Sequence, residues 1–446
     1  MNAWLLESTQ HAFRRKLAAI LIGLFVLVHG QSLFRDYGHL LACVALDCFF
    51  RRRSVDAPGE MEGCKLNSGD ILAWHYSMRT PVRVEWQAGI ITSVAAAPEA
   101  PSDLWIAPGL FDLQVNGYGG VDFQRDTITR EDLFHAVRRM RTDGCTRFFL
   151  TLVTDKWPAM LARLQKFRNW RSQSDELKNS IAGWHIEGPF LSAQPGFHGA
   201  HDPALTCDPT PEHIRELRAG TGSDPLLLTM APERRGALEC IALAATLGMK
   251  VSLGHTDASA GTLAEAVKAG ASGFTHLGNG CTQQLDRHDN ILWRVFETPG
   301  LTAGVIPDRI HVSAPLFRIF HRQLSRIYYT TDAVSPAGAP PGRYSIGRWE
   351  VDVGADQVVR PAGKTHLAGS ALRPIQGVFR AAEMLGCAWQ ESWPRASLEP
   401  ARVAGFNEPL IAGQPADFCL LKQPGSNGPG ELQVYARGEV CAHEPE

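Results

Sequence analysis

Short apolar and β-branched runs alternate with amphipathic stretches from residue 107 onward, at intervals of about 20 to 40 residues. This alternation is typical of βαβ units, in which a helix joins two parallel strands. The intervening stretches, such as REDLFHAVRRMRTDG and TLAEAVKAG, end in a glycine, where a helix C-cap is expected. Eight strand-like runs can be counted: FDLQVNG (111–117), RFFLTLVT (147–154), IAGWHIEG (181–188), LLLTMAPE (226–233), KVSLGHT (250–256), GFTHLG (273–278), LTAGVIPD (301–308) and IYYTTDA (327–333).

Eight βα repeats predict an α/β fold, a TIM-like (β/α)8 barrel that occupies residues 107–365. The stretches on either side of the barrel have strand patterning without a helical period, namely VRVEW and GIITSV before it, and PADFCLL and LQVYARGEVC after it. We therefore expect the two flanks, 61–106 and 366–446, to form one small β-sandwich domain beside the barrel.

The first sixty residues allow two interpretations. Residues 14–28 combine basic side chains with the apolar run LAAILIGLFVLV, which is the layout of a signal or anchor segment. That run is too short to span a bilayer comfortably. The alternative is that translation begins at Met61, where strand patterning starts, and that 1–60 is a mis-assigned start. We favour the second interpretation, which predicts a cytoplasmic protein whose catalytic part does not bind membranes.

Charge and cysteine content narrow the function classes. Lys and Arg total 44 against 46 Asp and Glu, a formal net charge of −2, which excludes a binder driven by electrostatic attraction to nucleic acid or anionic lipid. The 10 cysteines are scattered and form no C-x-x-C pair, as expected for reduced thiols in the cytoplasm.

Polar residues gather at the carboxyl ends of the predicted strands. In a barrel these ends converge on one face, which holds the active site. Loop capping explains one or two such residues, but one Glu, two His and one Asp on four strands form a metal-site composition. The residues at these strand ends are Gln114, Asn116, Glu187, His255, His276 and Asp332.

Six sequence motifs carry a family resemblance: APGLFDLQVNGYGGVDF, HIEGPFLS with GAHDP, SLGHTDA, THLGNGCTQ, TTDAVSPAG and LAGSAL. In this order and at these intervals they resemble the amidohydrolase superfamily, specifically the N-acetylglucosamine-6-phosphate deacetylase family. The resemblance runs from about residue 70 to the C-terminus. It implies a carbon–nitrogen hydrolase of amino sugar catabolism, which converts N-acetylglucosamine 6-phosphate to glucosamine 6-phosphate and acetate.

The resemblance implies that Glu187, His255 and His276 hold a divalent cation, and this donor set suits Zn²⁺, with Fe, Co or Mn as alternatives. His185, two residues before Glu187, is expected to point the same way along the strand and to position the ligands without binding the metal itself. Many superfamily members place a second metal on a His-x-His motif in the first strand. Here Gln114 and Asn116 replace it, and neutral amides are poor zinc ligands, so we expect one metal per chain.

The resemblance also assigns the catalytic groups. Asp332 is placed to take a proton from the attacking water and to return it to the leaving amine. His201, in GAHDP, is expected near the amide carbonyl, where it helps to stabilise the developing oxyanion.

Substrate-binding positions depart from the family pattern. The resemblance implies phosphate or sugar contacts for Asn279, Gly280 and His311. His311 matches the family's Asp-Gly-x-His element, but here Arg309 stands within that element and its glycine is missing. Arg287 lies eleven residues after His276, the family's spacing for a phosphate-binding arginine that often acts across a dimer interface. It is also interpretable as a surface charge. The partners expected are thus an amino sugar phosphate and a second copy of the chain.

Two further functions stay open at this point. The glycines at 278 and 280 reduce bulk after His276, which allows an amidohydrolase for another acylated amino sugar or a cyclic amide. A catalytically silent barrel that binds a sugar phosphate is the other alternative, and the presence of Glu187 and Asp332 counts against it.

Overall fold

The computed structural model describes residues 67–361, 363, 367–407, 409–426 and 428–442. The signal-like segment 14–28, the leader 1–60 and the proposed start at Met61 lie outside these residues. Within the part of the chain that is described, every helix is too short or too polar to cross a lipid bilayer.

An eight-stranded parallel sheet forms the barrel, and the predicted fold class is confirmed. Each of the eight predicted runs overlaps one of its strands. Around the barrel the order is β14-β13-β12-β11-β10-β9-β8-β5. The strands are β5 (Leu110–Val115), β8 (Cys145–Val153), β9 (Ile181–Glu187), β10 (Leu226–Met230), β11 (Lys250–Leu253), β12 (Ala271–Phe274), β13 (Thr302–Val305) and β14 (Ile327–Tyr329).

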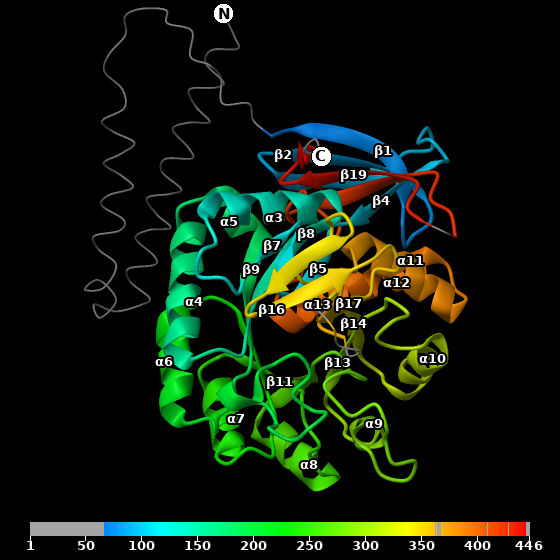
Figure 1. Ribbon diagram of the computed structural model, residues 1–446. Coiled ribbons are helices and arrows are strands. Elements are labelled where there is room, and N and C mark those ends of the chain that lie inside the picture. The colour runs from blue at the N-terminus through cyan, green and yellow to red at the C-terminus, as the bar shows by residue number, and fades with distance from the viewer. Residues whose placement is uncertain (1–66, 362, 364–366, 408, 427, 443–446) are drawn as a thin grey trace, which may run out of the picture. The chain divides into compact units, whose positions relative to one another are not determined.

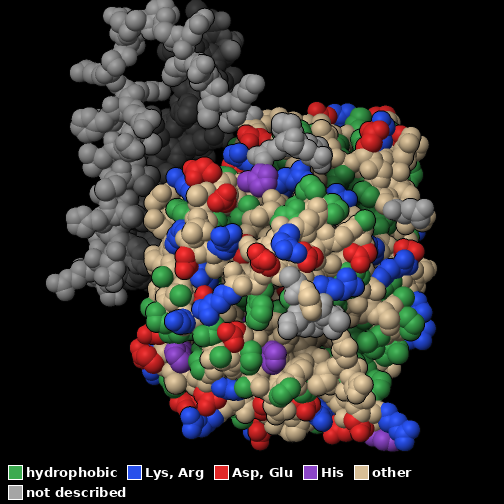
Figure 2. All heavy atoms as spheres, in the orientation of Figure 1, with side chains coloured by type: hydrophobic (Ala, Val, Ile, Leu, Met, Phe, Trp, Pro, Cys, Tyr) green, Lys and Arg blue, Asp and Glu red, His purple; other side chains and the backbone are tan. Residues whose placement is uncertain are grey.

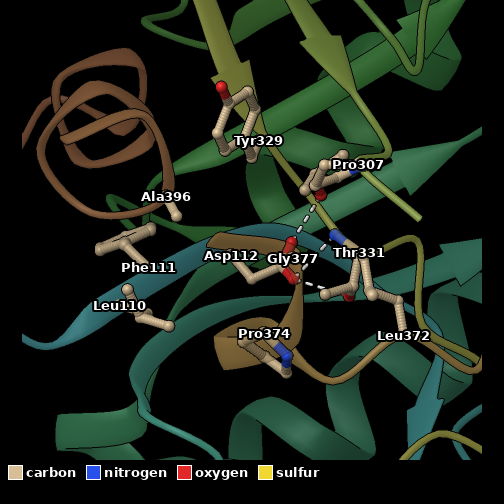
Figure 3. A pocket seen from close by; sticks show the side chains of 11 residues that line it. Leu110, Phe111, Asp112, Pro307, Tyr329, Thr331, Leu372, Pro374, Gly377 and Ala396 are labelled. Atoms are coloured by element: carbon tan, nitrogen blue, oxygen red, sulfur yellow. Dashed lines mark hydrogen bonds between the residues drawn. The ribbon is translucent and has the colours of Figure 1, made fainter. Parts of the chain in front are cut away.

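The seam between the first and last barrel strands is joined by side chains as well as backbone. Val115 and Ala333 form an isolated parallel bridge, next to which Asn116 N donates to Ala333 O over 2.7 Å. Below this bridge, Asp112 of β5 accepts hydrogen bonds from the hydroxyls of Thr330 and Thr331 and from Thr331 N. Figure 3 shows Asp112 directed toward Thr331, beside a small pocket with a cavity volume of about 10 Å³. The first and last strands are thus held together next to the functional face.

Helices cover the outside of the barrel, and Figure 1 shows α4, α6, α7 and α8 in sequence along one side. Side chains cap several of them: the hydroxyls of Thr129, Thr210, Ser259 and Ser313 accept backbone N–H groups at helix N-termini. These helices are α3 (Arg130–Thr142), α4 (Trp157–Ser172), α5 (Asp175–Ser180), α6 (Pro211–Thr221), α7 (Ala237–Thr246), α8 (Ala260–Ala269), α9 (Ile291–Phe296) and α10 (Ala314–Gln323), with a 3-10 turn η1 at Pro203–Leu205.

The two flanks of the barrel meet in one separate sheet, so the prediction that they join in a β domain is confirmed. Its seven strands run in the order β20-β19-β18-β4-β1-β2-β3, and β18 pairs antiparallel with β4. Figure 1 shows the N-terminal strands in blue and the C-terminal strands in red within this one layer. The strands are β1 (Gly69–His75), β2 (Pro81–Gln87), β3 (Ile90–Ala96), β4 (Leu104–Pro108), β18 (Phe418–Lys422), β19 (Glu431–Ala436) and β20 (Glu439–Val440).

Three helices lie within 366–446, the segment assigned from the sequence to the β domain. They are α11 (Pro374–Leu385), α12 (Trp389–Ala396) and α13 (Leu398–Ala404). All three contact β5, and α12 and α13 also contact β14. We propose that these helices belong with the barrel and that the β domain's C-terminal part begins after them.

A small three-stranded sheet follows β14, in a segment where no separate sheet was predicted. It consists of β15 (Gly342–Ile346), β16 (Trp349–Val353) and β17 (Val359–Pro361). Gly347 N donates to Asp122 Oδ2 over 2.7 Å, and this bond ties the turn between β15 and β16 to the short hairpin of β6 (Gly117–Tyr118) and β7 (Val121–Asp122).

Candidate active site

The three predicted metal ligands converge at the carboxyl ends of their strands. Glu187 ends β9, and His255 and His276 each follow the last residue of a strand by two positions. His276 Nε2 lies 2.8 Å and His255 Nε2 3.3 Å from Glu187 Oε1, and the two Nε2 atoms are 3.2 Å apart. Donors on a tetrahedral zinc ion with bonds of about 2.0–2.2 Å lie roughly 3.4 Å from one another. The three side chains therefore have the chemistry and spacing of a divalent cation site.

The backbone is strained where these side chains turn inward. His255, His276 and Asp332 have φ values of +52°, +30° and +51°. Left-handed conformations at residues other than glycine cost of order 1–3 kcal/mol each and persist where the surrounding structure enforces them. Three such residues after the carboxyl ends of β11, β12 and β14 indicate that the surrounding structure holds this face in a defined arrangement.

The ring of His255 is fixed in orientation and tautomer. Its Nδ1 lies 2.7 Å from the carbonyl oxygen of Phe197, which only accepts, so Nδ1 carries the proton and Nε2 presents a lone pair to the cluster. A Cβ at Gly199 would lie 3.0 Å from Cε1 of this ring, and one at Gly280 would lie 2.9 Å from Nδ1. Gly280 is thus required by the packing of His255.

Burial and the neighbouring groups have opposite effects on the pKa values of Glu187 and His276. Burial raises the pKa of Glu187, but its close contacts with His255 and His276 outweigh this effect and bring the net pKa well below its usual value. Burial lowers the pKa of His276, yet its hydrogen bond to Glu187 leaves the net pKa raised. Among the described residues no hydrogen-bond partner faces the buried Nδ1 of His276. Glu187 is therefore ionised and supplies the negative charge that a cation would neutralise.

Asp332 is held from the first strand. Its Oδ1 accepts from Gln114 Nε2 over 2.9 Å and from Asn116 Nδ2 over 2.7 Å. Burial, followed by the charge of Glu187, raises the pKa of Asp332 to about 7, against the opposing effect of His276. A carboxyl group with this pKa both accepts and donates a proton near neutral pH.

His201 is the fourth group at the cluster. Its Nε2 lies 3.7 Å from Glu187 Oε2, and its ring meets that of His255 edge to face with centroids 4.6 Å apart. The ligand atoms of Glu187, His201 and His255 all lie within 4.8 Å of one another, so His201 is close enough to this cluster to share an ion with it. Burial lowers the pKa of His201 to about 3, so the ring is neutral.

His185 lies beneath the ligands, within a chain of hydroxyl groups. Its Nε2 is 2.7 Å from Thr229 Oγ1, which is 2.7 Å from Thr275 Oγ1, and Thr275 donates to Ser252. Burial lowers the pKa of His185 to about 4, so this ring is also neutral. The chain joins His185 to Thr275, the residue directly before His276.

The predicted substrate residues are only partly brought to this face. Asn279 Nδ2 donates to His276 O over 3.1 Å, and His311 Nδ1 lies 2.6 Å from Asp308 Oδ2. The charge of His311 also lowers the pKa of Asp332, which places His311 near the site. Arg287 is exposed and donates to His288, and in the described residues no hydrogen bond links it to the cluster.

Two groups at the site were not singled out from the sequence. Thr154, the residue after β8, lies beside His201, and Asp112 crosses the barrel seam. Thr154 has the same signal as the predicted residues, a polar side chain at the end of a strand-like run. Asp112 sits inside its run, where a polar residue among apolar ones also marks a position of interest.

Comparison with known proteins agrees with this geometry. No protein-family model matches the chain. The N-acetylglucosamine-6-phosphate deacetylase of Danio rerio is 32% identical over 330 residues, covering 71% of this chain and 80% of that protein. The chain belongs to the N-acetylglucosamine-6-phosphate deacetylase family. It is thus an amidohydrolase-type hydrolase, in a metal-dependent family.

Other deacetylases support this membership. The deacetylase of Vibrio furnissii is 31% identical over 319 residues, covering 71% of this chain and 77% of that protein. A structure of a Mycobacterium smegmatis deacetylase mutant, in complex with N-acetyl-D-glucosamine-6-phosphate, aligns with a TM-score of 0.75 at 30% identity. That alignment covers 84% of this chain and all of the other. N-isopropylammelide isopropylaminohydrolase of Burkholderia multivorans, at 15% identity and a TM-score of 0.53, shares the fold.

Proposed function

We propose that the chain hydrolyses the acetamide of N-acetylglucosamine 6-phosphate to glucosamine 6-phosphate and acetate. Membership of the deacetylase family supports this proposal. The observation that carries it is the buried cluster of Glu187, His255 and His276 beside Asp332, which combines a cation site with a proton-transfer group.

One divalent cation per chain is the proposed cofactor, zinc in the first place, with iron, cobalt or manganese as alternatives. Glu187, His255 and His276 would hold it. A bound cation of this kind acidifies a water molecule and polarises the amide carbonyl. Because Gln114 and Asn116 donate to Asp332, their amides are engaged where other superfamily members carry a second metal motif.

Two side chains carry the proposed proton transfer and the stabilisation of developing charge. Asp332 takes a proton from the attacking water and then gives it to the leaving amine, for which a pKa of about 7 is suited. The amides on Oδ1 keep the carboxyl group in one orientation. His201 donates a hydrogen bond to the carbonyl oxygen as negative charge develops on it.

The remaining proposals concern the substrate and the assembly. Asn279, Gly280 and His311 would contact the sugar phosphate, and Arg287 would bind a phosphate across the interface of a homodimer. The enzyme is proposed to be cytoplasmic and to have no nucleic-acid or membrane partner. In Figure 2, basic and acidic side chains are interspersed over the visible face, which supports the absence of a nucleic-acid-binding surface there.

Acetate release tests the function directly. The protein as isolated is incubated with N-acetylglucosamine 6-phosphate and, separately, with N-acetylglucosamine. Release from the phosphorylated sugar alone is expected, and a chelated sample is the control. Equal release from both would indicate an amidohydrolase for unphosphorylated amino sugars. Release from neither would contradict the proposal and leave a silent barrel or a different amide.

The two glycines that suggested a different acylated amino sugar have an explanation in the local packing. A Cβ at Gly278 would lie 3.3 Å from both Phe320 and Val312, and Gly280 is packed against His255. Both residues also have positive φ. The two glycines are therefore explained by the local fold without an enlarged sugar pocket.

A further inference from the structure

Thr154 contacts His201 with both its backbone and its side chain. It directly follows β8 and is 8% exposed. Its hydroxyl lies 2.8 Å from His201 Nδ1, and its backbone N–H points at the same nitrogen over 3.4 Å. A Cβ at Gly188, which has a φ of +87°, would collide with this hydroxyl. The turn after Glu187 is thus shaped to leave room for Thr154.

These two contacts define where the His201 proton resides. A backbone N–H can only donate, so Nδ1 of His201 must accept, and a neutral imidazole then carries its proton on Nε2. His255 is the opposite case, because its Nδ1 faces the carbonyl of Phe197. The two rings meet edge to face, but one presents a lone pair to the cluster and the other an N–H group.

We propose that Thr154 is a positioning residue that orients the His201 ring and keeps its proton on Nε2. A ring in this state cannot ligate a cation through Nε2, but it can donate to a carbonyl oxygen. Thr154 thereby separates His201 from the ligand group of Glu187 and His255. The donation to a substrate carbonyl rests on the proposed deacetylase function, whereas the ring's orientation and tautomer do not.

Nitrogen NMR of the isolated protein, labelled with ¹⁵N-histidine, tests the tautomer without substrate. The protonated and unprotonated ring nitrogens have well-separated shifts, and a His201→Asn sample assigns the signals. We expect His201 to show a proton on Nε2 in the wild type. A proton on Nδ1 in the wild type would overturn the proposal, whether or not any variant folds.

Variants at Thr154 test its part in this state. Thr154→Val replaces the hydroxyl with a methyl group, and Thr154→Ser keeps the hydroxyl and removes the methyl group. Thr142→Val is the matched control, since Thr142 is 7% exposed and its hydroxyl donates to Arg139 O in α3. We expect Thr154→Val to shift or broaden the His201 signals and to lower kcat about 10- to 100-fold, with metal content unchanged. Thr154→Ser and Thr142→Val should stay within about 3-fold of the wild type.

The outcomes distinguish this proposal from the proposed function. Wild-type protein that releases no acetate would contradict the function, while the His201 signals of Thr154→Val would still decide the role of Thr154. If the wild-type enzyme is active, unchanged His201 signals together with an unchanged kcat in Thr154→Val would contradict the positioning role of Thr154. Loss of activity in Thr142→Val as well would show only a general cost of removing a buried hydroxyl and would also count against it.

Discussion

The side-chain amide of Asn116 donates to Oδ1 of Asp332 over 2.7 Å and so joins the first barrel strand to the residues after the last. Gln114 donates to the same oxygen. A His-x-His motif at these positions would offer ring nitrogens to a metal. The amides in their place both donate to Oδ1, so they orient the Asp332 carboxylate without occupying its Oδ2. The first strand therefore contributes to proton transfer by positioning Asp332.

Replacing Asp332 with Asn should remove activity without removing the metal. Asparagine keeps the size of the side chain but cannot take a proton, so kcat should fall by about 10³-fold. Metal content measured by elemental analysis should stay near one equivalent, because Glu187, His255 and His276 are untouched. A variant with normal turnover would contradict the role of Asp332.

Removing the metal should abolish turnover reversibly. Dialysis against a chelator should eliminate acetate release, and adding back one equivalent of zinc should restore it. Elemental analysis should give one metal per chain. Two equivalents would mean that Gln114 and Asn116 do not exclude a second ion.

Metal binding should release protons and weaken as the pH falls. The pKa of Asp332 is raised to about 7 and that of His276 is also raised, so both groups hold protons below neutrality in the metal-free protein. A cation favours their deprotonated forms, so affinity should increase from pH 5 to 7 and level off above. Calorimetry in two buffers of different ionisation enthalpy measures the proton count, and Asp332→Asn should release fewer.

Gly280→Ala should weaken metal binding through His255. Its Cβ would lie 2.9 Å from the ring, and its φ is +60°. Gly386 is the matched control, with a φ of +67° and nothing within 4 Å of the added Cβ. Both variants should lose about 1–2 kcal/mol of stability from backbone strain. Only Gly280→Ala should lose metal affinity, by about 10-fold or more, as measured by competition with a chromogenic chelator.

Arg287→Ala should affect only the phosphorylated substrate. If its guanidinium binds the phosphate, KM for N-acetylglucosamine 6-phosphate should rise about 10-fold or more, as expected for the loss of a charge-assisted bond. Any slow turnover of the unphosphorylated sugar should not change. Arg235→Ala, which removes another highly exposed arginine, is the control. An unchanged KM would make Arg287 an ordinary surface charge.

The barrel could be predicted from the sequence because each strand carries its own periodic signal. The segment from Gly342 to Pro361 also alternates, but its sheet is anchored by contacts with Asp122, which sequence spacing does not reveal. Helices α11 to α13 were missed for a related reason. These helices pack against barrel strands that are distant in the sequence, and the local sequence pattern does not identify those strands.

The part of the candidate site that lies at the carboxyl ends of the strands could be predicted from the sequence. Glu187, His255 and His276 meet because parallel strands deliver their carboxyl ends to one face. The left-handed backbone of His255 and His276 could not be read from residue types, since it is imposed by the surrounding packing. The pairing of Thr154 with His201 was likewise invisible, because it joins two loops that the fold alone brings together.

The pairing of Phe418 with Pro108 has a consequence for biosynthesis. Strand β4 leads directly into β5, which carries Gln114 and is followed by Asn116, yet its neighbour β18 is synthesised only after all eight barrel strands. A nascent chain can therefore contain every proposed catalytic residue and still lack the strand that completes the sheet beside them. Deletions from β18 onward should yield inactive, protease-sensitive protein, although they remove no residue of the site.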